Sequence, residues 1–421
     1  MLKSSRLQEW RRSRWFGFTL FLWQRFNGLR VPQTAGSLTF TSLLALVPVL
    51  TVALVVISAF PMFSEVSGEF VRFINMTIVP QGADAVMDYL NEFKAKASNL
   101  TAIGIIMLGV TSLLLVQTID QTFNRIWQVK NPRPLWMQFL LYWALLTFGP
   151  LAVGVSLLVW GLLLKQSGLE TAFPLLSETL AAVTSLLFST VALWLLYRLV
   201  PNRFVPAKHA FAGALITAVL LEILRWGFKL YISRFNSYQL IYGAFAAIPV
   251  FLVWLHALWM VVISGAVLTS TFSYWRGEAF RRRLDAHGRF DDVLKILLLL
   301  DEAQQSGRVM KVQQFRQHIN MGYDELGDLL EQLVRYGYTF QGRHGWVLKT
   351  NAEHIIISDL FKYFVYRSTG PASETDYLAK TIDQIMQPCI ENLHISLADF
   401  KGRMQAHRDG PPEDASRKPE E

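Results

Sequence analysis

The sequence has a single cysteine, Cys389, among its 421 residues. It therefore has no intramolecular disulfide framework and no CxxC or cysteine-rich zinc motif. Charge is also scarce, because Asp, Glu, Lys and Arg make up 17% of the residues, where a soluble globular protein has about 25%. Hydrophobic residues make up 52%, and they are concentrated in uninterrupted blocks. These proportions exclude a disordered, collagen-like or simple soluble globular chain.

Motifs of enzyme chemistry are also missing from the sequence. The eight histidines show neither HxH nor HExxH spacing, and there is no GxxxxGK[ST] phosphate loop and no GxSxG nucleophile elbow. We therefore expect no metal, no cofactor and no enzymatic activity. His256 lies within an apolar block, where it either relays protons or is satisfied by a neighbouring helix.

Six apolar blocks are long enough to cross a membrane, which requires about 20 mostly apolar residues. They cover residues 37–60, 100–119, 139–164, 180–200, 209–230 and 241–272. The sequence therefore predicts an all-α polytopic membrane protein whose transmembrane domain is residues 37–275. Residues 1–36 precede it, and within them residues 5–26 are predicted to form an interfacial helix with Trp and Phe in the headgroup layer.

The distribution of Lys and Arg predicts the orientation of these spans. Seven precede the first span, three lie in each of the second-to-third and fourth-to-fifth loops, and five follow the sixth, against six on the opposite side. Because Lys and Arg are retained in the cytoplasm, both termini are predicted to be cytoplasmic. Residues 1–289 carry a net charge of +13, residues 290–367 of −1 and residues 368–421 of −4. The overall charge of +8 is therefore a topology signal, and nucleic acid is disfavoured as a partner.

Residues 290–367 have the pattern of a small winged-helix-like domain. Two predicted helices end at Gly307 and Gly337, and residues 342–345 form the turn of a hairpin in the wing position. A short second helix over residues 312–319 lies between these two helices, so the helix that ends at Gly337 is the third. In a DNA-binding winged helix the third helix would enter the major groove, but here its charged residues are mainly acidic. We therefore expect it to bind protein or to pack on the membrane bundle. These charged residues are Asp324, Glu325, Asp328, Glu331 and Arg335.

Residues 368–421 complete the predicted cytoplasmic part. Apolar residues at helical spacing over 375–400 predict an amphipathic helix that Pro388 breaks midway. The tail beyond Ala406 is predicted to be disordered. Residues 290–400 are the candidate surface for a protein partner or for self-association.

Polar residues at membrane depth are costly unless they are paired or line water, so they are candidate site residues. Glu222, Arg225 and Lys229 share one face of the fifth predicted span because they are three and four residues apart. They either form a charged lining for an anionic solute, or Glu222 pairs with Arg225 while Lys229 extends to the interface.

A second polar cluster ends the second predicted span. Asp120, Asn124 and Arg125 lie there, together with Gln117 and Gln121. This cluster is either a hydrogen-bond network at a helix end or a site for a substrate or ion.

Prolines and glycines within the blocks are candidates for broken or closely packed helices. Pro48, Pro150 and Pro249 each remove a backbone donor, and such broken helices form substrate sites in transporters, although packing kinks are commoner. Gly243 and Gly265 would allow a neighbouring helix to approach closely.

Three ordered motifs resemble those of the YihY/BrkB family of bacterial inner-membrane proteins. They are residues 35–40 (AGSLTF) leading to Pro48, residues 123–127 (FNRIW), and residues 238–244 (YQLIYGA) continuing to Gly265. The family usually has glutamate where this chain has Val267. The resemblance implies six helices in the bacterial inner membrane, and the family's old label, ribonuclease BN, is regarded as a misassignment.

Three functions are compatible with these features. The first is transport or export of a small or lipid-linked anionic solute through the membrane domain. The second is a membrane-anchored regulator or scaffold that acts through the cytoplasmic domain. The third, ribonuclease, is disfavoured because no residues that could hold a catalytic metal are visible.

Overall fold

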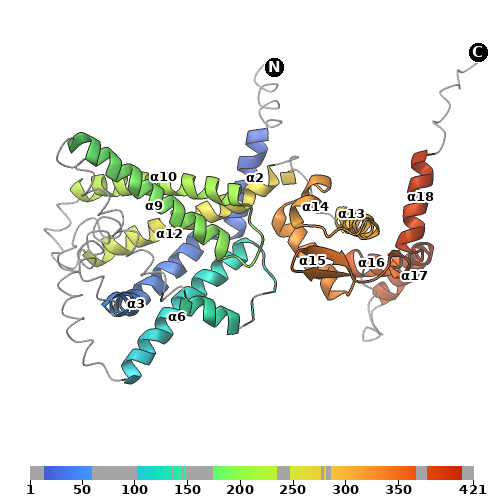
Figure 1. Cartoon of the computed structure of the whole chain (residues 1–421), viewed down its shortest axis with the longest axis horizontal. Helices are drawn as coiled ribbons and strands as arrows, with labels where there is room; N and C mark the ends of the chain where they lie inside the picture. Colours follow the sequence, from blue (N-terminus) through green and yellow to red (C-terminus); the bar gives the residue numbers. More distant parts are fainter. Residues whose placement is uncertain are drawn as a thin grey trace, which may run out of the picture. The chain divides into compact units, whose positions relative to one another are not determined.

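The computed structural model describes residues 14–58, 102–131, 133–134, 136–144, 147, 174–234, 247–275, 279–280, 286–366 and 377–409. The chain divides into two compact units, residues 1–273 and 274–421. Figure 1 shows that the described parts of the first unit are long helices, whereas the second unit contains shorter helices and one hairpin.

Long helices account for most of the described part of the first unit. They are α2 (Arg14–Gly28), α3 (Val31–Ser58), α6 (Ala102–Ile126), α9 (Pro174–Leu199), α10 (Ala207–Arg234) and α12 (Ala247–Thr271). A short helical segment covers residues 136–144. Helix α10 packs between α9 and α12, and α3 packs against α6 and α12. These packed helices enclose a core that includes Leu38, Phe123, Tyr197, Ala214 and Ile263.

Large apolar side chains also cover much of the outside of these helices. Trp226, Ile223 and Leu187 are 70%, 58% and 59% exposed. A soluble protein rarely exposes apolar surface on this scale, whereas a lipid-facing helix must. Among the described residues, two helices are long and apolar enough to cross a membrane, Ala207–Ser233 and Pro249–Tyr274.

Helices α10 and α12 pack closely through a reciprocal pair of glycines and threonines. Thr217 on α10 donates to the carbonyl of Gly213 in its own helix, and its Oγ1 occupies the space beside Gly265 of α12. In the same way, Thr269 donates to the carbonyl of Gly265 and occupies the space beside Gly213. A Cβ at either glycine would lie 1.8 Å from the facing threonine Oγ1. Both glycines are therefore required by this helix approach.

The second unit begins with three helices and a hairpin. These are α13 (Ala286–Gln305), α14 (Val312–His318), α15 (Tyr323–Arg335), β1 (Thr339–Gly342) and β2 (Gly345–Leu348). Gly307 and Gly337 follow α13 and α15 with φ of 64° and 83°, a conformation that glycine adopts without strain. Strands β1 and β2 are antiparallel, with Phe340 opposite Val347. Met310 forms a further bridge to Trp346, which extends this small sheet by one segment.

The remaining elements of this unit are the short turn η5 (Ala352–His354) and three helices, α16 (Ile357–Phe364), α17 (Tyr377–Asn392) and α18 (Leu397–Asp409). The expected break at Pro388 is wrong, because Pro388 lies inside α17 and the chain turns only at residues 393–396. Helix α18 also continues past Ala406 to Asp409. The core of the unit includes Ile296, Phe315, Leu330, Trp346 and Leu360.

Several predicted features lie outside the described residues. These are most of the third predicted span, Pro150, Gly243 and the last twelve residues, 410–421.

Candidate functional site

Asp120 is the centre of a buried polar network near the C-terminal end of α6. The Asp120 side chain is 5% exposed. Oδ2 accepts hydrogen bonds from Asn124 Nδ2 at 2.8 Å and from Tyr142 Oη at 2.9 Å. Oδ1 lies 3.4 Å from Arg133 Nη1 and completes an ion pair. A carboxylate this deeply buried is stable only with such partners, so all four side chains form one structural unit.

The same network binds the end of α9. Arg133 Nη1 donates to the carbonyl of Val200 at 3.0 Å, and Nη2 donates to that of Leu199 at 3.2 Å. The last carbonyls of a helix have no partner within the helix and carry partial negative charge, which a guanidinium satisfies. Asn124 Oδ1 accepts the backbone N–H of Asn202 at 2.8 Å. The network therefore fastens α6, the 136–144 segment and the end of α9 together.

A recess of about 650 Å³ opens beside this network. Arg125 and Lys130 are exposed at this recess, whereas Asp120 and Asn124 face it from their buried positions. Asp120 is the single acidic residue of this lining, against the two basic residues Arg125 and Lys130. Its lining consists of Gln117, Asp120, Gln121, Asn124, Arg125, Gln128, Val129, Lys130 and Gln138.

A second hollow of about 210 Å³ adjoins the first. Gln117 and Gln138 line both hollows, so the two share a boundary between α6 and the 136–144 segment. The rest of the second lining is mainly apolar, and it consists of Val110, Leu113, Leu114, Phe139 and Tyr142. We call the two adjoining hollows the groove, and its charged side chains, Asp120, Arg125 and Lys130, all lie in the larger hollow.

All five residues of the second predicted cluster line the recess. Of the three side chains that bind Asp120, the sequence pattern pointed only to Asn124 and not to Arg133 or Tyr142. Arg133 had been counted only as a topology cation, and Tyr142 and Asn202 carried no local signal. One weak hint of the role of Arg133 was present in the sequence. It is a basic residue shortly after the end of a helix, and such residues commonly satisfy terminal helix carbonyls.

Glu222 and Arg225 form an ion pair in α10. Arg225 Nη1 lies 3.0 Å from both carboxylate oxygens of Glu222. Ser185 of α9 is close to both, because its Oγ donates to Glu222 Oε1 at 3.3 Å and accepts from Arg225 Nη1 at 3.5 Å. Lys229 is exposed, and no ion pair in the described part of the chain joins it to Glu222. The pair links two helices and carries no net charge.

The other predicted residues occupy separate places. His256 on α12 faces α3, where its Cε1 lies 4.0 Å from the position of a Cβ on Gly36. Pro48 is buried within α3, which continues through it. Pro249 lies in the first turn of α12 and does not interrupt that helix, because a first-turn residue needs no backbone donor. Gly265 faces Thr217 and Tyr197.

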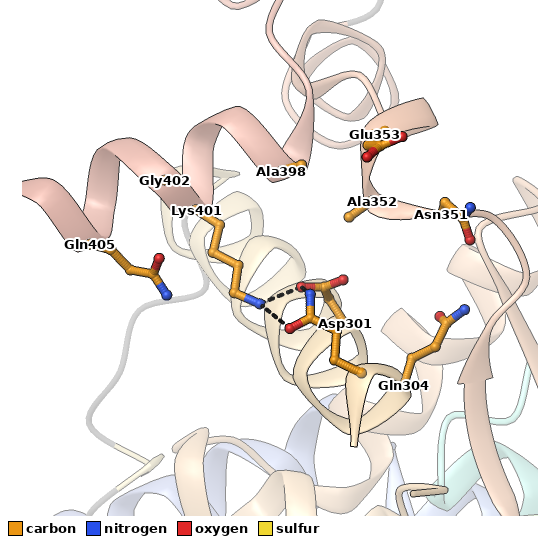
Figure 2. A pocket seen from close by; sticks show the side chains of 10 residues that line it. Asp301, Gln304, Asn351, Ala352, Glu353, Ala398, Lys401, Gly402 and Gln405 are labelled. Atoms are coloured by element: carbon orange, nitrogen blue, oxygen red, sulfur yellow. Dashed lines mark hydrogen bonds and ion pairs between the residues drawn. The ribbon is translucent and has the colours of Figure 1, made fainter. Parts of the chain in front are cut away.

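The described residues contain no group of three or more His, Cys, Asp or Glu side chains that could hold a metal ion. In the second unit, a polar hollow of about 480 Å³ lies between α13, η5 and α18 (Figure 2). Lys401 Nζ of α18 lies 2.5 Å from Asp301 Oδ2 of α13 and donates to Gln305 Oε1 at 3.4 Å. This ion pair fastens α18 to α13.

We expect Lys401→Met to loosen α18. The substitution leaves the Asp301 carboxylate, whose side chain is 9% exposed, without its cation, at a cost of about 1–3 kcal/mol. Hydrogen–deuterium exchange of residues 397–409 should therefore become faster. Arg403→Met, at an exposed position of the same helix, is the control and should leave exchange unchanged. Equal exchange in both variants would show that the pair does not hold α18.

Comparison with known proteins identifies the family. Residues 22–287 match the family described as Virulence factor BrkB. The chain belongs to this family. This BrkB-family chain is also similar, over more than 90% of its length, to three relatives that are each named UPF0761 membrane protein. The relative from Neisseria meningitidis serogroup C is 57% identical over 383 residues, which cover 91% of this chain and 93% of the relative.

The other two relatives are more distant members of the same group. That from Chromobacterium violaceum is 49% identical over 402 residues, covering 94% of this chain and 96% of the relative. That from Nitrosospira multiformis is 38% identical over 390 residues, covering 91% and 92%. The resemblance inferred from the three motifs is confirmed, and this BrkB-family chain is a membrane protein. No solved structure matches it.

Proposed function

We propose that this protein is a six-span inner-membrane protein with cytoplasmic termini, that it is not an enzyme, and that it binds and transfers an anionic, lipid-linked solute. The lengths of the helices support the spans. At 1.5 Å per residue, the 25 residues of α6 extend about 37 Å and the 28 residues of α10 about 42 Å, enough to cross a hydrocarbon core of about 30 Å.

The observation that carries the proposal is the groove beside α6. An amphiphile has a charged headgroup and an apolar tail, and the groove has a basic recess that adjoins an apolar hollow. Arg125 and Lys130 match an anionic headgroup, while the glutamines that line both parts can hydrogen-bond to its ester or sugar oxygens. With the proposed topology, the recess opens at the cytoplasmic interface, where such headgroups lie.

The Glu222–Arg225 pair is less suited to the same task. Both oxygens of Glu222 are within 3.0 Å of Arg225 Nη1, so the cation is already neutralised. An anion that bound there would have to displace this carboxylate at membrane depth. We therefore assign the pair to the packing of α9 against α10.

Phosphatidylglycerol, as a simple anionic lipid, tests the groove. Native mass spectrometry of the purified full-length protein should show bound phosphatidylglycerol in preference to phosphatidylcholine. Arg125→Glu with Lys130→Glu should weaken binding by more than tenfold, since each cation near an anionic headgroup contributes about 1 kcal/mol. Lys208→Glu, an exposed cation outside the recess, is the matched control and should leave binding unchanged.

The transfer step needs a separate readout. In proteoliposomes with fluorescent phosphatidylglycerol, the protein should raise the rate at which the lipid changes leaflet, and the double variant should lose this increase. Wild-type rates in the double variant, together with a loss in Arg225→Ala, would move the site to α10. Equal lipid binding by the double variant and by Lys208→Glu would refute the groove.

A second function is proposed for residues 290–367, as a regulatory domain of winged-helix type. The order of α13, α14, α15 and the β1–β2 hairpin supports this architecture. Asp324 and Asp328 of α15 are buried, and Tyr274 and Gln332 respectively bind their carboxylates. A helix turned inward in this way is poorly placed to enter a DNA groove, so the domain is proposed to contact something other than DNA.

A further inference from the structure

The hairpin of the second unit has one face that points away from the core. Met310 and Trp346 bridge each other and are buried. Because side chains alternate along a strand, the residues that flank them point to the opposite face. Opposite residues of an antiparallel pair share a face, so Phe340 lies beside Val347 there. We call this the wing face, and it comprises Val309, Lys311, Phe340, Val347 and Lys349, with Arg343 in the adjoining turn.

Other contacts agree with this assignment. A Cβ on Gly345 would lie 2.9 Å from Val309 Cγ1, which places the Val309 side chain over β2. The backbone N–H of Lys349 donates to the carbonyl of Tyr338, so the ladder continues to Lys349. Phe340 is 56% exposed and Val309 is 41% exposed. The wing face therefore presents an aromatic ring and an aliphatic side chain to solvent.

The charged residues of the segments that supply this face are all basic. Lys311, Arg343 and Lys349 are exposed, and so is Arg308 beside Val309. Residues 303–323 and 332–352, which supply this face, contain no aspartate or glutamate. A basic surface with exposed apolar side chains is the composition of proteins that bind at the interface of anionic membranes, where the cations meet headgroup phosphates and the apolar groups enter the boundary of the acyl chains.

The connection to the membrane helix favours a lipid surface as the partner. Tyr274 follows the end of α12 by three residues, and its hydroxyl donates to Asp324 at 2.8 Å and to Glu325 at 2.9 Å. Tyr274 is the first residue of the second unit, so this unit begins three residues after the apolar helix α12 along the chain. A short tether to the bilayer raises the effective lipid concentration, so even weak attraction produces contact.

We propose that the wing face binds the anionic headgroup layer of the cytoplasmic leaflet, with Phe340 and Val309 entering the interface. Nucleic acid is the less suitable partner. Exposed Phe340 and Val309 gain nothing from phosphate contacts.

The test uses full-length protein in liposomes. In a Cys389→Ser background, His344→Cys in the exposed hairpin turn carries an environment-sensitive fluorophore. Its emission should shift to the blue and rise about twofold in vesicles with 30% phosphatidylglycerol relative to pure phosphatidylcholine. Because the attraction is electrostatic, 0.5 M NaCl should reverse most of the change.

Two variants assign the effect to the wing face. Lys311→Glu with Lys349→Glu should abolish the shift, and Phe340→Ser should reduce it. Lys295→Glu with Lys362→Glu reverses two exposed lysines of α13 and α16 and should preserve it. Arg125→Glu with Lys130→Glu should also preserve it, which separates this contact from the groove.

Three outcomes would overturn the proposal. The first is equal emission in the two kinds of vesicle. The second is loss of the emission shift in the control variant, Lys295→Glu with Lys362→Glu. The third is an emission shift produced by an RNA or DNA oligonucleotide in phosphatidylcholine vesicles. The last result would identify nucleic acid as the partner. Thermal unfolding of each variant establishes that the domain remains folded. As an independent readout, hydrogen–deuterium exchange of residues 339–349 should be faster in Lys311→Glu with Lys349→Glu than in the unsubstituted protein.

Discussion

Replacement of Asp120 by leucine is expected to destabilise the protein by about 3 kcal/mol. The substitution leaves the half-buried Arg133 without its anion and removes the acceptor of Asn124 and Tyr142. Removal of one partner of a buried ion pair costs about 3–5 kcal/mol, and we expect the lower end because Arg133 keeps two carbonyl acceptors. The unfolding midpoint of detergent-purified protein, followed by tryptophan fluorescence, measures this effect.

Two further variants make the test specific. Gln121→Leu, at an exposed position of the same helix, should change the midpoint little. Arg133→Leu in addition to Asp120→Leu should recover part of the loss, since an apolar pair leaves no unpaired charge, but not all of it, since the carbonyls of Leu199 and Val200 lose their donor. If Asp120→Leu matches Gln121→Leu, the network does not hold the bundle together.

Gly213→Ala is expected to destabilise the α10–α12 interface by about 2 kcal/mol, although it adds a single methyl group. The new Cβ would lie 1.8 Å from Thr269 Oγ1 and 2.9 Å from Thr269 Cβ, so the helices must separate or Thr269 must move. Overpacking of this kind typically costs 1–3 kcal/mol. A lower unfolding midpoint, measured as above, would report the loss.

The same helix contains a matched control. Gly227 has no atom within 4 Å of its Cβ position, so Gly227→Ala should be neutral or stabilising, because alanine has the higher helix propensity. Thr269→Gly added to Gly213→Ala removes the clashing side chain and should restore part of the midpoint. A midpoint for Gly213→Ala equal to that of Gly227→Ala would contradict the close packing of α10 on α12.

Much of the architecture was predictable because it depends on local spacing. Long apolar runs indicated membrane helices, and three short motifs indicated the BrkB family, which the comparisons confirm. In the second unit, Gly307 and Gly337 marked the ends of helices because a positive φ suits glycine. The expected break at Pro388 failed, because the helix passes through this exposed proline and ends at Asn392.

The candidate site was predictable only in part. Helical spacing grouped Gln117, Asp120, Gln121, Asn124 and Arg125, and the structure places all five at one recess. Spacing also put Glu222 beside Arg225, but it left open whether they pair with each other or face a solute. The contact with Ser185 of another helix was not visible in the sequence.

The sequence by itself determined which segments are apolar and which family the chain belongs to, because these depend on composition and on neighbours within one or two helical turns. It also predicts which side of the membrane carries the cations. The tertiary structure decided what each polar group contacts. Arg133, Tyr142 and Asn202 reach the Asp120 network from separate segments. Asp324 and Asp328 turn inward although the helix that carries them has an acidic composition. A buried charge must find its partners wherever packing brings them, and no local pattern records that.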